Sequence, residues 1–325
     1  MTLAVTRRAA GGPETLLLET IDLQPPGPAE ARVRQTWAGV NFVDVYHRIG
    51  LYPLPPGAAV LGVEAAGVVE ALGPGVEGLE PGQRVAWAGA SPGAYAQARN
   101  IPAERLIALP DAIGDRTAAA AMLKGVTAHM VLRRVCPVGR GDTVLVQAAA
   151  GGLGLILVQW AKRLGATVIG TAGSEAKADR ARAAGADEVI LYRQEDFVAA
   201  VRRLTGGRGV DAVLDGVGGE VLLRSLDCVR PFGLVVSLGQ ASGELPAIPL
   251  TELGPRRSLA VARPSVFAYA ADQTSYRAAA GELFDLLQDG LEVAAGLTLP
   301  LAQAAEAHRA LEAGRTSGAV LLDLA

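Results

Sequence analysis

The sequence predicts an α/β protein in which a doubly wound parallel sheet is joined to a second, β-rich domain. From residue 143 to residue 265, short apolar segments alternate with helix-length amphipathic segments, a pattern typical of a parallel sheet with helices on both faces. Before residue 125, short apolar segments are separated by turn sequences such as PPGP, GPGV and EPG, which indicates a barrel or a sandwich.

Composition and charge narrow the classes of function. A chain of 325 residues, 50% hydrophobic and 19% charged, is long enough for two domains with large cores. The net charge of −3 and the lack of a basic run disfavour nucleic acid as a partner. No stretch reaches the ~18 apolar residues of a membrane span, so no membrane partner is expected. Two cysteines cannot form a disulfide framework, which predicts a reducing, cytoplasmic location.

The β-rich region contains four strand-like segments and two helix-like segments. We expect its strands at residues 31–40, 64–73, 83–90 and 105–110. One helix is expected over NFVDVYHRIG at 41–50. The other is an alanine-rich run that begins near Asp115, a candidate N-cap, and ends before Pro137.

The parallel sheet begins with the segment that predicts its ligand. Residues 143–146 resemble a buried strand, and the small-residue turn AAAGGLG follows before an amphipathic helix. Such a turn lets the backbone approach a pyrophosphate, and N–H groups at the helix start attract its negative charge. In the fingerprint G-x-G-x-x-G, Ala149 takes the first glycine position, and Gly151 and Gly154 the others. A dinucleotide site is predicted, with an ordinary strand-to-helix turn as the alternative.

Five further strands continue this sheet, with helices between them. We expect these strands at residues 166–173, 187–192, 210–218, 233–239 and 258–265. Six strands in this alternation predict the order 3-2-1-4-5-6, with the ligand at their carboxyl ends.

The segment after Pro264 carries no nucleotide signal and is expected to pack on the first domain. Its elements are predicted as a helix at 272–288, a strand at 297–300, a helix at 301–314 and a strand at 318–324. The catalytic domain is therefore expected to comprise residues 1–124 and 264–325, and the dinucleotide-binding domain residues 125–263.

The end of the second strand of the sheet predicts which dinucleotide binds. NAD-preferring sites usually carry Asp or Glu there, whereas this strand ends in GTAGS at 170–174. Ser174 supplies a hydroxyl and Lys177 an ammonium one helical turn later, which suit a 2′-phosphate. Tyr192 stands at the end of the third strand, where it could cover the adenine ribose. We therefore predict NADPH. The alternative is that Ser174 only caps the helix and Lys177 is a solvated surface residue.

Motifs in both domains resemble the medium-chain dehydrogenase/reductase superfamily. They are GVEAAGVV at 62–69, LKGVTA at 123–128, AAAGGLG at 148–154 and GTAGSEAK at 170–177. The runs NFVDVYHRIGLYP at 41–53 and ARPS at 262–265 are similar to the quinone oxidoreductase (zeta-crystallin-like) branch. The resemblance covers nearly the whole chain. It implies a GroES-like β-barrel catalytic domain, a Rossmann domain and a homodimer joined through the cofactor domains.

Zinc-dependent members of this superfamily hold a catalytic metal with a Cys and a GHE motif. Here Asn41 and Gly62-Val63-Glu64 stand at those positions. Zinc needs thiolate or imidazole ligands, and the cysteines and histidines show no ligand spacing, so no metal is predicted. The histidines are expected to be structural: His47, His129 and His308. Without a Lewis acid, a quinone or an activated enone is an easier acceptor than an alcohol, because its conjugated carbonyl draws the hydride.

The same resemblance implies the site residues. Asn41, Tyr52 and Lys124 are the catalytic candidates, with Tyr52 offering a ring to stack and a phenol to a carbonyl oxygen. Cofactor contacts are implied at Phe42, Tyr46, Thr127, Met130, Gly151, Gly152, Leu153, Gly173, Ser174, Lys177, Tyr192, Gly239, Ser242, Arg263, Ser265 and Ser317. Structural alternatives stay open: Tyr46 and Tyr52 are packing aromatics, Lys124 is a surface lysine, and Glu64 is a hydrogen-bond acceptor rather than a base.

These features predict an NADPH-dependent quinone oxidoreductase that works without metal, with the quinone held between Tyr52 and the nicotinamide. The first alternative is a reductase of α,β-unsaturated carbonyls, either enones or enoyl thioesters. That reaction also needs an enolate stabiliser and a proton donor, for which Tyr52 or Lys124 would serve. The second alternative is a nucleotide-binding protein with an RNA-binding or structural role, although the charge weighs against RNA.

Overall fold

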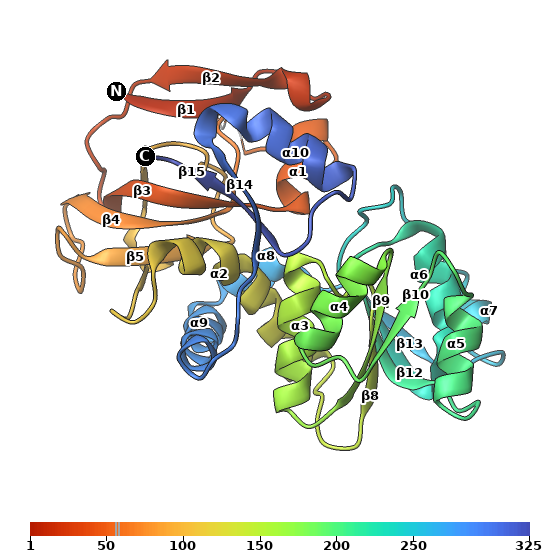
Figure 1. Cartoon of the computed structure of the whole chain (residues 1–325). Coiled ribbons are helices and arrows are strands. Elements are labelled where there is room, and N and C mark those ends of the chain that lie inside the picture. Colours follow the sequence, from red (N-terminus) through yellow and green to blue (C-terminus); the bar gives the residue numbers. More distant parts are fainter. Residues whose placement is uncertain (56, 58) are drawn as a thin grey trace. The chain divides into compact units, whose positions relative to one another are not determined.

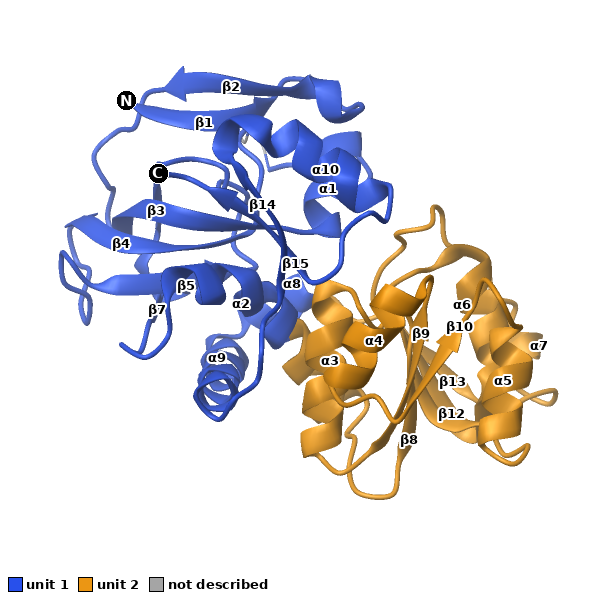
Figure 2. Cartoon of the chain, in the orientation of Figure 1, with its two compact units in different colours: residues 1–126, 266–325 blue, residues 127–265 orange. Residues whose placement is uncertain are grey.

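The computed structural model describes residues 1–55, 57 and 59–325. They form two compact units (Figure 2). Residues 1–126 and 266–325 make the β-rich unit, and residues 127–265 make the parallel-sheet unit. Both boundaries between the units were expected from the sequence two residues earlier, after residues 124 and 263.

The parallel-sheet unit is built on six parallel strands in the order β10-β9-β8-β11-β12-β13. In chain order the strands are β8 (Thr143–Val146), β9 (Thr167–Ala172), β10 (Glu188–Leu191), β11 (Val210–Asp215), β12 (Val229–Ser237) and β13 (Ala260–Ala262). Counted from β8 this is 3-2-1-4-5-6, so the predicted order is confirmed. Leu145, Ile169, Val213 and Val235 form its buried centre, because a strand covered on both faces is apolar throughout.

Helices cover both faces of this sheet (Figure 1). They are α3 (Gly152–Arg163), α4 (Glu175–Ala183), α5 (Phe197–Leu204), α6 (Gly219–Ser225) and the single turn α7 (Leu250–Leu253), with a 3-10 turn η4 (Leu226–Cys228). Ser174 and Asp196 cap α4 and α5 by accepting hydrogen bonds from the N–H groups of Lys177 and Ala199. The sequence did not predict α7, which is too short to show a helical period.

The β-rich unit contains a seven-stranded sheet in the order β14-β15-β3-β4-β5-β7, with β6 also paired to β3, and a separate hairpin of β1 and β2. The strands are β1 (Thr2–Arg7), β2 (Leu16–Ile21), β3 (Glu30–Val40), β4 (Glu64–Leu72), β5 (Arg84–Ala88), β6 (Ala98–Pro102), β7 (Ile107–Ala108), β14 (Ala295–Pro300) and β15 (Ala319–Asp323). β15 pairs antiparallel with β3, so the C-terminal segment is part of this sheet. Leu61, Trp87 and Tyr95 are fully buried in its core.

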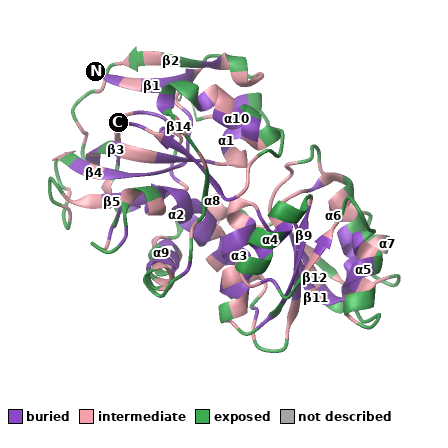
Figure 3. Cartoon of the chain, in the orientation of Figure 1, coloured by how far each residue is buried: buried purple, intermediate pink, exposed green. Residues whose placement is uncertain are grey.

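The helices of this unit are α1 (Phe42–Ile49), α2 (Asp115–His129), α8 (Val266–Ala271), α9 (Gln273–Gln288) and α10 (Ala304–Glu312). Short 3-10 turns are η1 (Pro13–Thr15), η2 (Ala103–Arg105) and η5 (Leu301–Gln303). From Thr127 on, α2 and the π-helical turn that continues it, η3 (Met130–Val135), belong to the parallel-sheet unit. Buried residues line the strands, whereas outer helix faces are exposed (Figure 3). Among the described residues no helix is long and apolar enough to cross a membrane.

The sequence did not predict β1, β2, β6 or α8. β2 begins with three leucines and keeps no alternation, since Leu17 and Leu18 are exposed. β6 has the polar sequence ARNIP. β6 depends on pairing with β3, which is distant in the sequence, and such pairing leaves no local pattern.

Candidate functional site

The glycine-rich turn lies between β8 and α3, at the carboxyl edge of the parallel sheet. Gly151 has the extended backbone of an N-cap, and its N–H donates to the Ala148 carbonyl at 2.9 Å. A Cβ on Gly154 would press into the turn, 2.8 Å from the carbonyl carbon of Ala149. The turn therefore needs glycine at position 154. The first N–H groups of the 12-residue helix, which begins at Gly152, have no partner within the helix and suit an anion, whereas the Gly151 N–H is already bonded to Ala148.

Ala148 departs from the pattern that the sequence predicted. Its φ of 52° lies in the left-handed region, where a residue with a Cβ is strained by about 1–2 kcal/mol. The fingerprint comparison put the missing first glycine at Ala149, whereas the left-handed residue is the one before it. The sequence therefore located the turn correctly but not its point of strain.

A group of polar side chains gathers at the start of α4, where the 2′-phosphate site was predicted. A Cβ on Gly173 would lie 2.7 Å from Tyr192 Oη and 3.5 Å from Arg193 Nε, so both side chains lie over this glycine. Ser174 accepts the N–H of Lys177 at 3.4 Å, which confirms that it caps the helix. Burial, and secondly the charge of Arg193, lower the pKa of Lys177. Two cations thus share one small region.

Sequence reasoning missed Arg193. The available signal was its place directly after Tyr192, just beyond the end of β10. A second cation beside Lys177 strengthens the case for a bound anion, because two like charges repel until a negative group lies between them.

Three other predicted cofactor residues lie near the carboxyl ends of β11, β12 and β13. Ser242 donates its backbone N–H and its hydroxyl to the Val217 carbonyl, at 2.9 and 3.0 Å. A Cβ on Gly239 would lie 2.7 Å from the Gly216 carbonyl oxygen. Arg263 donates to Ser237 Oγ at 2.9 Å, next to this loop.

In the β-rich unit, Glu64 connects two of the catalytic candidates. Its carboxylate is fully buried and accepts from Lys124 Nζ at 2.9 Å, Asn41 Nδ2 at 2.8 Å and the Leu123 N–H at 2.6 Å. Gly39 leaves the space that the carboxylate fills, since any Cβ there would clash with Glu64 Oε2. Glu64 is thus a hydrogen-bond acceptor, as favoured from the sequence. The alternative view of Lys124 as a surface lysine is wrong, because its side chain is buried.

A second buried carboxylate, Asp44, holds Asn41 from the other side. Asp44 Oδ2 accepts the Asn41 N–H at 2.8 Å and the Tyr95 hydroxyl at 3.1 Å. Tyr95 Oη also lies 3.1 Å from His308 Nε2, and Arg48 Nη1 lies 3.2 Å from His308 Nδ1. Because arginine only donates, Nδ1 accepts and Nε2 carries the proton. Burial raises the pKa of Asp44 to about 7 and lowers that of His308 to about 3.

The predicted aromatic residues form one cluster on α1 and the segment after it. The rings of Tyr46 and Tyr52 meet edge to face with centroids 5.2 Å apart, and those of Phe42 and Tyr46 are 6.2 Å apart. The Tyr52 N–H donates to the Tyr46 carbonyl at 3.1 Å. Tyr46 is buried and Tyr52 half-buried, so packing explains the first ring and leaves part of the second accessible.

The remaining predicted residues are spread over other elements. Thr127 is half-buried on α2, and Met130 is buried at the start of η3. Ser265 ends the parallel-sheet unit, and Ser317 precedes β15 in the β-rich unit. Thr127 and Met130 lie three residues apart on the continuous helix formed by α2 and η3, whereas Ser265 and Ser317 lie outside it.

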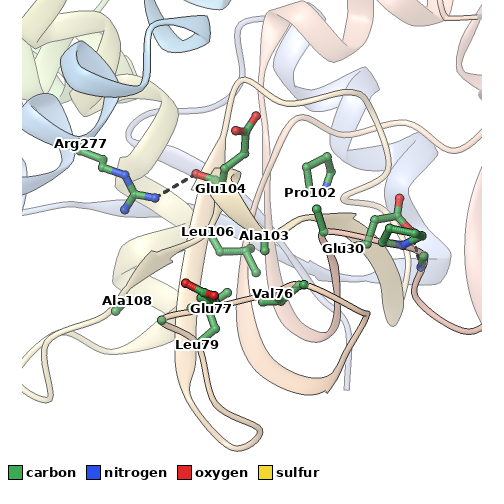
Figure 4. Close-up of a pocket in the computed structure, with 15 residues that line it drawn as sticks. Glu30, Val76, Glu77, Leu79, Pro102, Ala103, Glu104, Leu106, Ala108 and Arg277 are labelled. Carbon is green, nitrogen blue, oxygen red and sulfur yellow. Dashed lines mark hydrogen bonds between the residues drawn. The ribbon is translucent and has the colours of Figure 1, made fainter.

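A pocket in the β-rich unit is lined by none of the predicted residues (Figure 4). Its wall includes Val76, Leu79 and Leu106, and Arg277 donates to the Glu104 carbonyl at 3.3 Å beside it. It is therefore distinct from the group around Asn41.

Comparison with known proteins identifies the family. An alcohol dehydrogenase GroES-like domain matches residues 27–111, and a zinc-binding dehydrogenase domain matches residues 152–284. The quinone oxidoreductase of Pseudomonas aeruginosa is 45% identical over 97% of both chains, and the 2-haloacrylate reductase of a Burkholderia species is 43% identical over 99% of both. The chain belongs to the quinone oxidoreductase branch of the medium-chain dehydrogenase/reductase superfamily. The predicted GroES-like and Rossmann folds are thereby confirmed.

Solved structures agree with this assignment. The quinone oxidoreductase of Escherichia coli, determined in complex with NADPH, superposes with a TM-score of 0.96 at 41% identity over 99% of both chains. The donors of the parallel-sheet unit fit that cofactor, because the turn after β8 suits a pyrophosphate, and Arg193 over Gly173 together with Lys177 suits a 2′-phosphate.

The zinc in the name of the matching domain does not fit this chain. Val63, at the histidine position of the motif, is fully buried and offers no ligand atom. Asn41 and Glu64 are bonded to each other, and Glu64 is also paired with Lys124. Within the described part of the chain, no group of three or more His, Cys, Asp or Glu side chains could hold a metal ion.

Proposed function

We propose that this protein is an NADPH-dependent quinone oxidoreductase that transfers hydride to a quinone without a metal. The observation that carries the proposal is that Arg193 lies over Gly173 and its charge acts on Lys177, at a strand end that lacks an acid. The quinone as acceptor is supported by relatives of that name at 43–45% identity.

Bound NADPH supplies the hydride, and the chain supplies binding and orientation. The N–H groups of Gly152 and Leu153 receive the pyrophosphate at the start of α3, and Gly151, which has no side chain, lets it approach the backbone. Ser174 and Lys177 receive the 2′-phosphate, with Tyr192 over the ribose. The other predicted contacts, among them Gly239, Ser242 and Arg263 near the sheet edge, complete the nucleotide site.

The β-rich unit supplies the acceptor pocket in this proposal. Asn41, Tyr52 and Lys124 bind and orient the quinone, with Tyr52 offering the accessible ring and a phenol. A quinone needs no Lewis acid, because its conjugated carbonyl groups take up the developing charge. Lys124, which forms an ion pair with Glu64, stabilises the charge on the quinone oxygen further.

The second candidate is reduction of an α,β-unsaturated carbonyl. The buried Lys124–Glu64 pair favours it, since an ammonium stabilises an enolate oxygen and can also give up a proton. The similarity to a 2-haloacrylate reductase supports it as well.

We also propose a homodimer joined through the parallel-sheet units. β13 pairs with β12 on one side only and ends the sheet, and an open strand edge is a template for a second copy. Phe232 on β12 is 85% exposed and Leu250 on α7 is 82% exposed. Replacing Phe232 by Asp should shift the mass measured by light scattering from dimer to monomer, and an unchanged mass would remove this face as the interface.

For the cellular location we propose the cytoplasm, which the two free cysteines fit.

A nicotinamide-absorbance assay tests the activity. NADPH and NADH are each crossed with a benzoquinone, a naphthoquinone, an enone and an alcohol, with and without a chelator. The proposal expects quinone turnover with NADPH that the chelator does not affect. Enone turnover far above quinone turnover would favour the second candidate. Loss of activity with chelator would contradict a metal-free reaction, and NADPH binding without turnover of any acceptor would indicate a nucleotide-binding role.

A further inference from the structure

A continuous series of hydrogen-bonded, buried polar side chains lies beneath the carboxyl edge of the parallel sheet, where the nucleotide is proposed to bind; we call this series the Thr171 chain. The Ala148 N–H donates to Thr171 Oγ1 at 3.1 Å, and Thr171 Oγ1 lies 2.7 Å from Gln147 Oε1. Gln147 Nε2 lies 3.2 Å from Ser225 Oγ, which lies 3.3 Å from Asp215 Oδ2. All four side chains are buried, Asp215 and Ser225 completely.

The two ends of the chain fix the direction of every hydrogen bond in it. The Ala148 N–H can only donate, and the Asp215 carboxylate can only accept. Ser225 therefore donates to Asp215 and accepts from Gln147 Nε2. Gln147 Oε1 is then left to accept from the Thr171 hydroxyl, which in turn accepts from Ala148. Each member has one arrangement, and none can reverse without leaving a buried polar atom unpaired.

The Thr171 chain connects two segments with predicted roles in cofactor binding. At one end it holds Ala148, the left-handed residue that starts the glycine-rich turn. At the other end Asp215 accepts the N–H groups of Val217 at 2.7 Å and Gly218 at 3.0 Å. The Val217 carbonyl in turn holds Ser242, as described above. The Asp215 carbonyl accepts the Leu238 N–H at 2.6 Å.

We propose that Thr171, Gln147, Ser225 and Asp215 are positioning residues that act as one unit to hold the glycine-rich turn and the loop at 216–218 in the geometry that binds NADPH. The inference rests on the proposed function, because it requires the parallel-sheet unit to bind the dinucleotide. Asp215 is the anchor, since its carboxylate ends the chain and fixes the loop.

The alternative is that these bonds only stabilise the fold. The two cases differ at Thr171. Valine keeps the shape of threonine but removes both hydrogen bonds of the hydroxyl, whereas serine keeps the hydroxyl and loses a methyl group. If the chain positions the turn, Thr171→Val weakens NADPH binding and Thr171→Ser does not. If the side chain only fills space, the serine variant is the more damaged of the two.

The experiment measures NADPH dissociation constants by fluorescence titration, and thermal stability without ligand. The proteins are the wild type, Thr171→Val, Thr171→Ser, Ser225→Ala and the double variant Thr171→Val/Ser225→Ala. Thr205→Val is the matched control. Thr205 Oγ1 also accepts a backbone N–H, from Gly209, and donates to the Val201 carbonyl. It lies at the end of α5 and is not part of the Thr171 chain.

The proposal expects Thr171→Val and Ser225→Ala each to weaken NADPH binding about three- to tenfold, the equivalent of one hydrogen bond. The double variant should bind NADPH as tightly as the single variant with the lower affinity. Either change interrupts the same Thr171 chain, although the two residues do not touch. Thr171→Ser and Thr205→Val should bind like the wild type, even where they lower thermal stability.

Multiplying effects in the double variant would overturn the proposal, and so would weakening by serine as large as that by valine. Unchanged affinity in every variant, with tight binding by the wild type, would refute the inference and leave the proposed function standing. A wild-type protein that does not bind NADPH would refute both.

Discussion

The sharpest prediction for the cofactor concerns Lys177 and Arg193, the two cations near the start of α4. Lys177 is half-buried and feels the charge of Arg193, and in the proposed site both bind the 2′-phosphate. A hydrogen bond to a charged group contributes about 1.5–3 kcal/mol, or roughly 10–150-fold in affinity. Because two cations share the phosphate, Lys177→Ala or Arg193→Gln alone should weaken NADPH binding near the lower limit, about tenfold. The double variant should lose about 100-fold.

Isothermal titration with NADPH and with NADH separates this effect from general damage. NADH lacks the 2′-phosphate, so its dissociation constant should stay the same in all three variants. Arg180→Gln is the matched control, because Arg180 is exposed on the same helix, α4. The preference for NADPH should also fall as salt is raised, since part of the attraction is exposed to solvent. Equal losses for NADPH and NADH, or an unchanged NADPH affinity, would refute the assignment.

Three further predictions concern stability. Glu64→Gln should lower the free energy of unfolding in urea by about 3–5 kcal/mol, because it leaves Lys124 buried without its partner. Asp179→Asn is its control, because it breaks the exposed ion pair with Arg182 and should cost under about 1 kcal/mol. Equal costs for the two substitutions would contradict the role of burial. Asp44, with a pKa raised from 3.8 to about 7, favours the folded state when protonated, so its contribution is lost as pH rises through that window. Asp44→Asn should make stability rise more steeply with pH there in urea titrations, and an unchanged slope would contradict the raised pKa. Ala148→Gly should stabilise by up to about 1 kcal/mol, as relief of left-handed strain exceeds the entropy cost of glycine; destabilisation would show that the alanine is not strained.

The sequence predicted the parallel-sheet unit well, because its information is local. The first four strands of this sheet are each an apolar run with a helix-length segment after it, and the handedness of such connections leaves few possible strand orders. The turn at 148–154 and the residues after β9 are also short, continuous motifs. Arg193 was missed because it reaches the site from the next strand, β10.

The buried polar groups of the β-rich unit could not be predicted in this way. Asn41 and Glu64 are 23 residues apart, Glu64 and Lys124 are 60 apart, and Arg48 and His308 are 260 apart. Nothing near Lys124 in the sequence shows that its ammonium is buried against a carboxylate. The same holds for the Thr171 chain, whose members come from β9, β11, α6 and the residue after β8.

The most direct test of the central claim is the kcat/KM for quinone reduction by metal-stripped protein, measured with NADPH and with NADH. The proposed function predicts that the stripped protein keeps its full rate, that NADPH is preferred over NADH by about tenfold or more, and that the preference disappears in the Lys177→Ala/Arg193→Gln variant. Activity that returns only when zinc is added, or a preference for NADH, would contradict it.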